Sequence, residues 1–336
     1  MTDETEIMEA FDARARRRAE RRDFFRAFGA AAAIGGGLAL SSCGGGDDDS
    51  PTPTPTGTPT PTPTPSATNS SGLTDGDILN FALNLEYLEA QFYAFAATGS
   101  GLPSTLLTGA GTAGAVTGGR QVTFSDPVIA NYAREIAQDE RAHVEFLRNA
   151  IGTTAVAMPA IDISATATSA FSAAARAAGL IQAGQTFDPY ADDNSFLLGA
   201  YIFEDVGVSA YKGAAALLTS PIVLQAAAGI LATEAYHAAM IRSSLYAKGI
   251  ATPSLIDATE NISNARDGLD GASDIDQGVR PIGNQSNIIP VDANGIVFGR
   301  SAGQVLNIVY LNRSAVSAGG FFPAGLNGTI KTSAAN

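Results

Sequence analysis

Four stretches of the chain carry apolar residues at helical spacing, and each lies between polar start and stop signals. The first two open at Thr74-Asp75-Gly76-Asp77 and Ser125-Asp126-Pro127 and end at Gly99 and Gly152. The other two open at Asp193-Asn194-Ser195 and Ser220-Pro221 and end near residues 218 and 248–249. This periodicity predicts an all-α protein built on four long helices.

The connections between these helices differ in length. A few residues join the third and fourth helices, whereas roughly forty separate the second from the third, as in bundles with a crossover that makes those two helices parallel. The pattern therefore predicts a four-helix bundle over residues 73–250 with one long crossover.

Segments of different composition flank the predicted bundle. Residues 44–72 contain proline at nearly every second position from Pro51 to Pro65, which predicts an extended, semi-rigid linker. Residues 251–336 predict an irregular extension that docks on the bundle, with a short amphipathic helix near residues 301–312.

Two motifs outside the helices are interpreted as loops. Residues 109–114 fit the GxGxxG pattern, but no strand precedes them and the next helix starts too late for a dinucleotide site. Asp270, Asp274 and Asp276 do not have EF-hand spacing, so a solvated acidic loop is favoured over a calcium site.

The first 43 residues have the layout of an export signal. Arg21 and Arg22, followed by two phenylalanines and a basic residue, resemble a twin-arginine signal, and Leu40-Ser41-Ser42-Cys43 resembles a lipoprotein cleavage box. The expected location is the periplasm or cell envelope, with lipid at Cys43 as the only membrane anchor. The alternative is a short membrane anchor with an incidental cysteine.

Composition and charge exclude nucleic-acid binding and cysteine-based sites. The chain of 336 residues has a formal net charge of −13, 45% hydrophobic residues and a single cysteine. Such an acidic chain lacks the basic surface that nucleic-acid binding requires. One cysteine excludes an intrachain disulfide and cysteine-ligated metal clusters, so a metal ion would be held by nitrogen and oxygen.

The histidines carry the strongest chemical signal. There are only two, His143 and His237, and each follows a glutamate by three residues, Glu140 and Glu234. Residues at this spacing lie on the same helix face, so a carboxylate and an imidazole can bind one metal ion together. The pairs fall on the second and fourth predicted helices.

Further oxygen ligands are expected from the other two helices. The candidates are Glu86 and Glu89 on the first helix and Glu204 on the third. A tyrosine follows Glu86 and Glu204 by seven residues in each case, as Tyr93 and Tyr211, whereas Glu89 corresponds to a glycine. This internal repeat favours Glu86 as the ligand and leaves Glu89 as an alternative or a neighbouring hydrogen-bond partner.

A glutamate on one helix and Glu-x-x-His on the next, used twice, resembles the ferritin-like di-iron and di-manganese carboxylate proteins. The resemblance implies two bridging glutamates, two terminal histidines and two terminal glutamates around two iron or manganese ions. By position these are Glu140 and Glu234, His143 and His237, and Glu86 and Glu204. The expected surrounding residues are Glu89, Tyr93, Asp139 and Tyr211.

The C-terminal segment resembles the desiccation-related branch of the ferritin-like family. The similar stretches are Gln304–Tyr310, Gly319–Pro323 and Gly325–Gly328, and with the bundle the resemblance runs from about residue 74 to 330. Carboxylate and imidazole ligands suit iron or manganese, and a pair of such ions indicates oxidation of Fe(II) or turnover of peroxide, with oxygen or peroxide as the small partner. The resemblance to the desiccation-related branch does not itself indicate a reaction. The alternative is a non-catalytic protective or interaction protein.

A simpler interpretation of the predicted ligands is left open. The four glutamates and two histidines could face solvent, or pair with arginines such as Arg134 and Arg141 on the second helix.

Overall fold

The computed structural model describes residues 71–336. Residues 1–70 lie outside this description, and with them lie the predicted export signal at Arg21, Arg22 and Cys43 and nearly all of the Pro/Thr-rich linker. In the described part of the chain, no helix combines the length and the apolar character that crossing a membrane requires.

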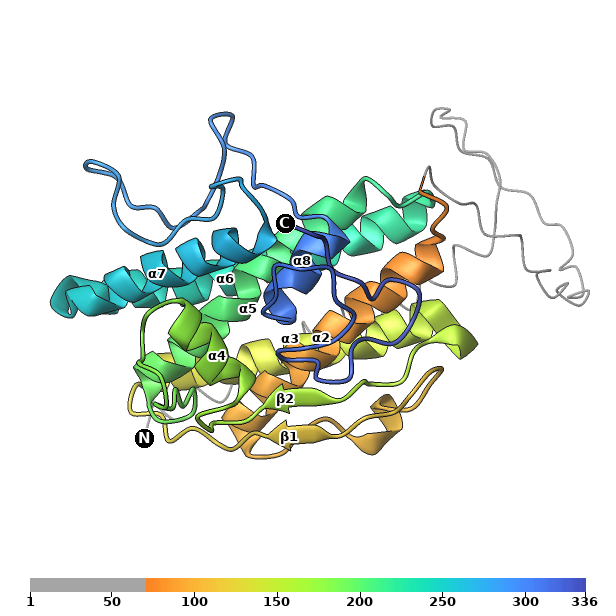
Figure 1. Cartoon of the computed structure of the whole chain (residues 1–336), viewed down its shortest axis with the longest axis horizontal. Helices are drawn as coiled ribbons and strands as arrows, with labels where there is room; N and C mark the ends of the chain where they lie inside the picture. The colour runs from red at the N-terminus through yellow and green to blue at the C-terminus, as the bar shows by residue number, and fades with distance from the viewer. Residues whose placement is uncertain (1–70) are drawn as a thin grey trace, which may run out of the picture. The chain divides into compact units, whose positions relative to one another are not determined.

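Two pairs of long helices form a bundle (Figure 1). Helix α2 (Asp75–Thr98) packs along α3 (Pro127–Ile151), and α5 (Asp193–Ala215) packs along α6 (Pro221–Ala251). Contacts of α2 with α5 and of α3 with α6 join the pairs. The prediction of an all-α four-helix bundle is confirmed.

The helix starts follow the capping chemistry of the sequence. The Thr74 side chain accepts a hydrogen bond from the Asp77 backbone N–H in a capping box, and Asp126 and Ser220 cap helices that begin with proline. The fourth helix continues past its predicted end near Gly249. A Cβ atom at Gly249 would lie 2.5 Å from Ile256, so this glycine permits close packing against the next helix and does not end its own.

The connections contain short elements that the sequence did not predict. Strand β1 (Val116–Gly118) lies in the α2–α3 connection, and strand β2 (Ile161–Ile163) lies in the crossover. The two strands pair in parallel, with Val116 opposite Ile161. The glycine-rich loop at 109–114 precedes β1 and forms a bridge between Ala110 and Val156. The elements are η1 (Ser104–Leu106), β1 (Val116–Gly118), η2 (Gly152–Thr154), β2 (Ile161–Ile163) and α4 (Ala170–Ala177).

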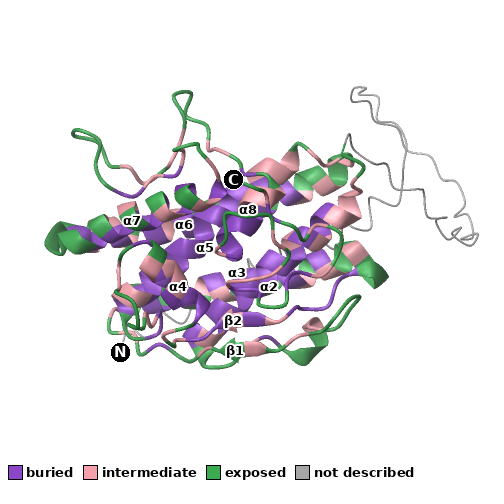
Figure 2. Cartoon of the chain, in the orientation of Figure 1, coloured by how far each residue is buried: buried purple, intermediate pink, exposed green. Residues whose placement is uncertain are grey.

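The C-terminal segment contains more helix than expected. Helix α7 (Pro253–Asp270) packs on α6, whereas α8 (Ala302–Val309) lies where a short helix was predicted. Beyond α8, Phe321 is buried, with ring centroids 4.9 Å from Phe203 on α5 and 5.1 Å from Phe171 on α4. The buried colouring in Figure 2 continues from the bundle into α8.

The acidic segment after α7 is not a solvated loop, and that prediction is wrong for two of its three aspartates. Asp274 is exposed, but Asp270 and Asp276 are buried and form ion pairs with Arg300 at 2.5 and 2.7 Å. Asp276 also pairs with Arg266 at 2.7 Å. The arginine partners come from distant parts of the chain, so local spacing did not reveal them.

Candidate metal centre

The helices that contribute one predicted ligand each are apolar on nearly every side. In α2 every residue from Leu83 to Ala94 is buried, and in α5 the buried run extends from Phe196 to Tyr211. A helix surrounded in this way has no solvent face, so a glutamate within it must point into the protein. Glu86 and Glu204 are accordingly buried.

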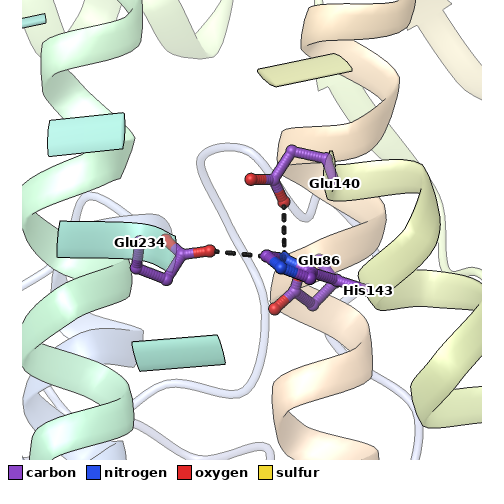
Figure 3. Close-up of side chains that lie close together, drawn as sticks. All are labelled: Glu86, Glu140, His143 and Glu234. Atoms are coloured by element: carbon purple, nitrogen blue, oxygen red, sulfur yellow. Dashed lines mark hydrogen bonds and ion pairs between the residues drawn. The ribbon is translucent and has the colours of Figure 1, made fainter. Parts of the chain in front are cut away.

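Three helices place acidic side chains around His143 (Figure 3). Its Nδ1 atom lies 3.1 Å from Glu86 Oε2 on α2 and 3.6 Å from Glu140 Oε2 on its own helix. Glu234 reaches over from α6, with Oε1 also 3.6 Å from His143 Nδ1. One ligand atom from each of these four residues lies within 4.8 Å of the others.

A second group surrounds His237, and Glu140 belongs to both. His237 Nδ1 lies 3.0 Å from Glu140 Oε1 and 3.7 Å from Glu204 Oε2. The other ring nitrogen, Nε2, is 3.5 Å from Asp139 Oδ2, a contact that orients the ring. The two imidazole centroids are 6.2 Å apart, so the two groups are adjacent halves of one site.

The tyrosines connect the two halves in a way that spacing along one helix does not indicate. Tyr93 on α2 donates its hydroxyl hydrogen bond to Glu204 on α5, and Tyr211 on α5 donates to Glu86 on α2. Each tyrosine therefore fixes the glutamate of the opposite helix. These two reciprocal hydrogen bonds fix the position of α2 relative to α5.

The donor set fits a pair of divalent cations. Both carboxylate oxygens of Glu140 and of Glu234, one of Glu204, and Nδ1 of His237 are buried, and within residues 71–336 none of them has a hydrogen-bond partner outside the cluster. Buried polar atoms rarely stay unpaired, and a cation between them satisfies several at once. Four carboxylates and two imidazoles suit iron or manganese, and their charges balance two ions of charge +2.

The simpler interpretation, with solvent-facing or arginine-paired ligands, does not hold. All six predicted ligands are buried. Arg141 pairs with Glu145, and Arg134 donates a hydrogen bond to Asn131. Neither arginine therefore neutralises the acidic cluster.

In the absence of a cation, protons reduce the charge of the carboxylates. Burial raises the pKa of Glu86 to about 7, against the attraction of His143. Burial likewise raises the pKa of Glu204 to about 8, with His237 opposing. The pKa of Glu234 rises well above its usual value because of burial and the nearby charge of Glu140.

Glu140 and the histidines form the charged part of the cluster. Burial alone would raise the pKa of Glu140, but the two histidines lower it below its usual range. Burial opposes the charge on His237, but hydrogen bonds with Asp139 and Glu140 raise its pKa to about 10. The neighbouring carboxylates also raise the pKa of His143 well above its usual value. Binding of a metal ion must therefore displace protons from this site.

Glu89 lies beside the two groups and belongs to neither. A Cβ atom at Gly207 would lie 3.3 Å from Glu89 Oε1 and 2.2 Å from Glu234 Oε2. Burial and then the charge of Glu140 raise the pKa of Glu89 well above its usual value. The geometry thus favours Glu86 over Glu89 as the ligand on α2.

Sequence reasoning missed the ionic support behind Glu204. The next residue, Asp205, pairs with Arg242 at 2.8 Å and with Arg266 at 3.0 Å, and all three are buried. A signal existed, because Arg242 is one of very few charged residues in the long helix α6. Gly207 gave no comparable signal, since only the packed structure reveals the close approach of Glu234.

Comparisons with known proteins agree with this geometry. The sequence model of the ferritin-like domain family matches residues 74–247. The ferritin-like catalase Nec2 of Nesocodon mauritianus is 31% identical over 279 residues, which cover 78% of this chain and 86% of that protein. The desiccation-related protein PCC13-62 of Craterostigma plantagineum is 31% identical over 265 residues, covering 74% and 82% respectively.

Proposed function

Because the chain belongs to the ferritin-like domain family, we propose that its buried cluster holds two iron or manganese ions that convert hydrogen peroxide into water and dioxygen. The observation that carries this proposal is the set of buried ligand atoms of Glu140, Glu204, Glu234 and His237 that have no hydrogen-bond partner outside the cluster among the described residues. The similarity to a protein named as a ferritin-like catalase favours peroxide as the substrate.

The chain's own residues supply position and charge balance. When bound, the two ions would supply the electrons that reduce one peroxide to water and recover them from a second peroxide, which leaves as dioxygen. Glu140 contacts both histidines, so its carboxylate would help to hold both ions. Tyr93 and Tyr211 hold Glu204 and Glu86 in place, so the ligands are oriented before any ion arrives.

The similarity to a desiccation-related protein favours a second candidate function. In that case the bundle and its ions protect without turnover, and the metal serves stability alone. A third reaction, oxidation of Fe(II) by dioxygen, uses the same ligands and differs in consuming dioxygen.

An oxygen electrode separates these functions. Protein stripped of metal and reloaded with Mn²⁺ or Fe²⁺ is expected to release one dioxygen for every two molecules of peroxide added. The metal-free protein is expected to be at least about 100-fold slower, because a fold without redox-active groups has no electrons to exchange.

A substitution on α3 outside the cluster is the control for the oxygen-electrode assay. Glu145→Gln changes a partly exposed glutamate on α3, outside the site, and is expected to keep full activity.

Protein that contains two ions and releases no dioxygen would support the protective role. Dioxygen uptake on addition of Fe²⁺ would support Fe(II) oxidation.

We also propose that the protein is exported and anchored by lipid at Cys43. Replacing Cys43 with serine is expected to move at least about 90% of the protein from the membrane fraction to the soluble fraction, because the acyl chains supply the membrane affinity. Replacing Arg21 and Arg22 with lysine is expected to leave an uncleaved precursor inside the cell. A Cys43→Ser protein that remains membrane-bound after cleavage would exclude the lipid anchor.

A further inference from the structure

An apolar cavity lies directly beside the proposed metal centre. Its walls come from α2, α5, α8 and the segment after α8, and they include Leu88, Val206, Ile308 and Phe321. The cavity is mostly enclosed and large enough for a molecule of about the size of water. Glu89 provides the one ionisable side chain of the lining.

Gly207 forms the boundary between the cavity and the centre. It lines the cavity, and a Cβ atom at this position would lie only 2.2 Å from Glu234 Oε2. Any side chain here would collide with the Glu234 carboxylate, so the glycine allows that carboxylate to pack against the wall of the cavity. Within the internal repeat, Glu89 on α2 occupies the position equivalent to Gly207 on α5, so this glycine contact is specific to the α5 side of the centre.

The apolar lining of the cavity favours a small apolar molecule as its occupant. Water or peroxide in an almost entirely apolar space would lose most of its hydrogen bonds, and dry apolar cavities in proteins bind apolar gases instead. Dioxygen is small, uncharged and apolar, and it is the gaseous product of the proposed reaction.

We propose that this cavity is a dioxygen-binding site, formed in part by the C-terminal extension, that receives dioxygen from the metal centre. The proposal rests on the proposed function for its biological role but not for the binding itself. The residues of α8 and Phe321 that form its outer wall are buried, so the C-terminal extension completes the site.

The test uses dioxygen itself as the probe. Because dioxygen is paramagnetic, it speeds the nuclear relaxation of methyl groups that it touches. In the full-length protein loaded with diamagnetic Zn²⁺, dissolved dioxygen is expected to raise the relaxation rates of the Ile308 and Val309 methyls at least about threefold more than those of Leu147 and Ile241. The latter two are equally buried but do not line the cavity.

Cavity-filling variants complete the experiment. Val206→Ile and Val309→Ile each add one methylene to the lining, and together they are expected to remove the enhancement at Ile308. Leu88→Met keeps the volume and is expected to retain it. Equal enhancement at all four reporter residues, or an enhancement that survives the filled cavity, would overturn the proposal.

A kinetic measurement separates this inference from the proposed function. With manganese at matched content, the filled variant is expected to show a lower kcat for peroxide and a KM lowered in proportion, with kcat/KM unchanged, because only the release of dioxygen is slowed. An unchanged kcat in the filled variant would overturn the role in release. A wild-type protein that releases no dioxygen would contradict the proposed function, whereas the relaxation result reports on binding alone.

Discussion

Removing both metal ions at about pH 8 is expected to lower the melting temperature by about 15 °C. Each ion present at about a thousandfold its Kd adds about 4 kcal/mol to the free energy of unfolding, and in a protein of this size each kcal/mol corresponds to about 2 °C. Without the ions, the buried carboxylates repel one another and are cut off from water. Differential scanning calorimetry of metal-loaded and metal-free protein measures the difference.

The gap between the two forms is expected to shrink as the pH falls toward about 5.5. The pKa values of Glu86, Glu204 and His237 are raised in the folded metal-free protein, to about 7, 8 and 10. Groups with raised pKa values contribute stability at low pH that is lost as the pH rises from their unfolded to their folded pKa values. The metal-free form therefore weakens between about pH 4.5 and 10. Metal binding has the opposite dependence, because it requires these groups to lose protons. A gap independent of pH would contradict the assignment of these residues as ligands.

Glu140→Gln is expected to have the largest effect of any single substitution in the centre. The glutamine cannot bridge two cations, so metal content is expected to fall from two ions to at most one, with loss of peroxide turnover. In the metal-free protein this change also removes the carboxylate that pairs with both histidines, at 3.0 and 3.6 Å. Breaking a buried ion pair costs about 3 kcal/mol or more, which corresponds to a drop in melting temperature of about 6 °C.

Glu234→Gln is the matched comparison. The sequence treats Glu140 and Glu234 as equivalent members of a repeat, but the metal-free protein does not. Burial and the charge of Glu140 raise the pKa of Glu234 and so disfavour its charged form. A neutral glutamine at this position is therefore expected to leave the metal-free melting temperature unchanged or slightly higher while still impairing metal binding. Metal analysis and calorimetry of both variants test the contrast, with Glu145→Gln as the control. Equal destabilisation by both substitutions would contradict the central position of Glu140.

Local chemistry made the bundle predictable. Thr74, Asp126 and Ser220 signal helix starts through short-range capping, and Glu140 with His143 share a helix face through spacing alone. Such features depend on neighbours within one turn, so a single sequence contains them in full.

Contacts between distant segments were not predictable in the same way. Periodicity showed that Tyr93 and Tyr211 accompany glutamates, but it did not show that each bonds the glutamate of the other helix. The ion pairs of Asp276 depend on how Arg266 and Arg300 fold back on the bundle, and no spacing rule encodes that path. Packing between elements decides these contacts.

The buried ion pairs of Asp205 connect the four-helix bundle to the chain that follows it, so they determine where the chain can be shortened. The family match ends at residue 247, yet Asp205, next to a proposed ligand, pairs with Arg266 beyond that limit. A chain that stopped at residue 250 would lose Arg266 and four of the six hydrogen-bond acceptors of Arg242, among them the carbonyl groups of Gly278 and Ile288. The buried Asp205–Arg242 pair would then keep only a small part of its support. The bundle therefore depends on segments beyond its own helices, and a nonsense mutation before residue 266 is expected to destabilise the centre.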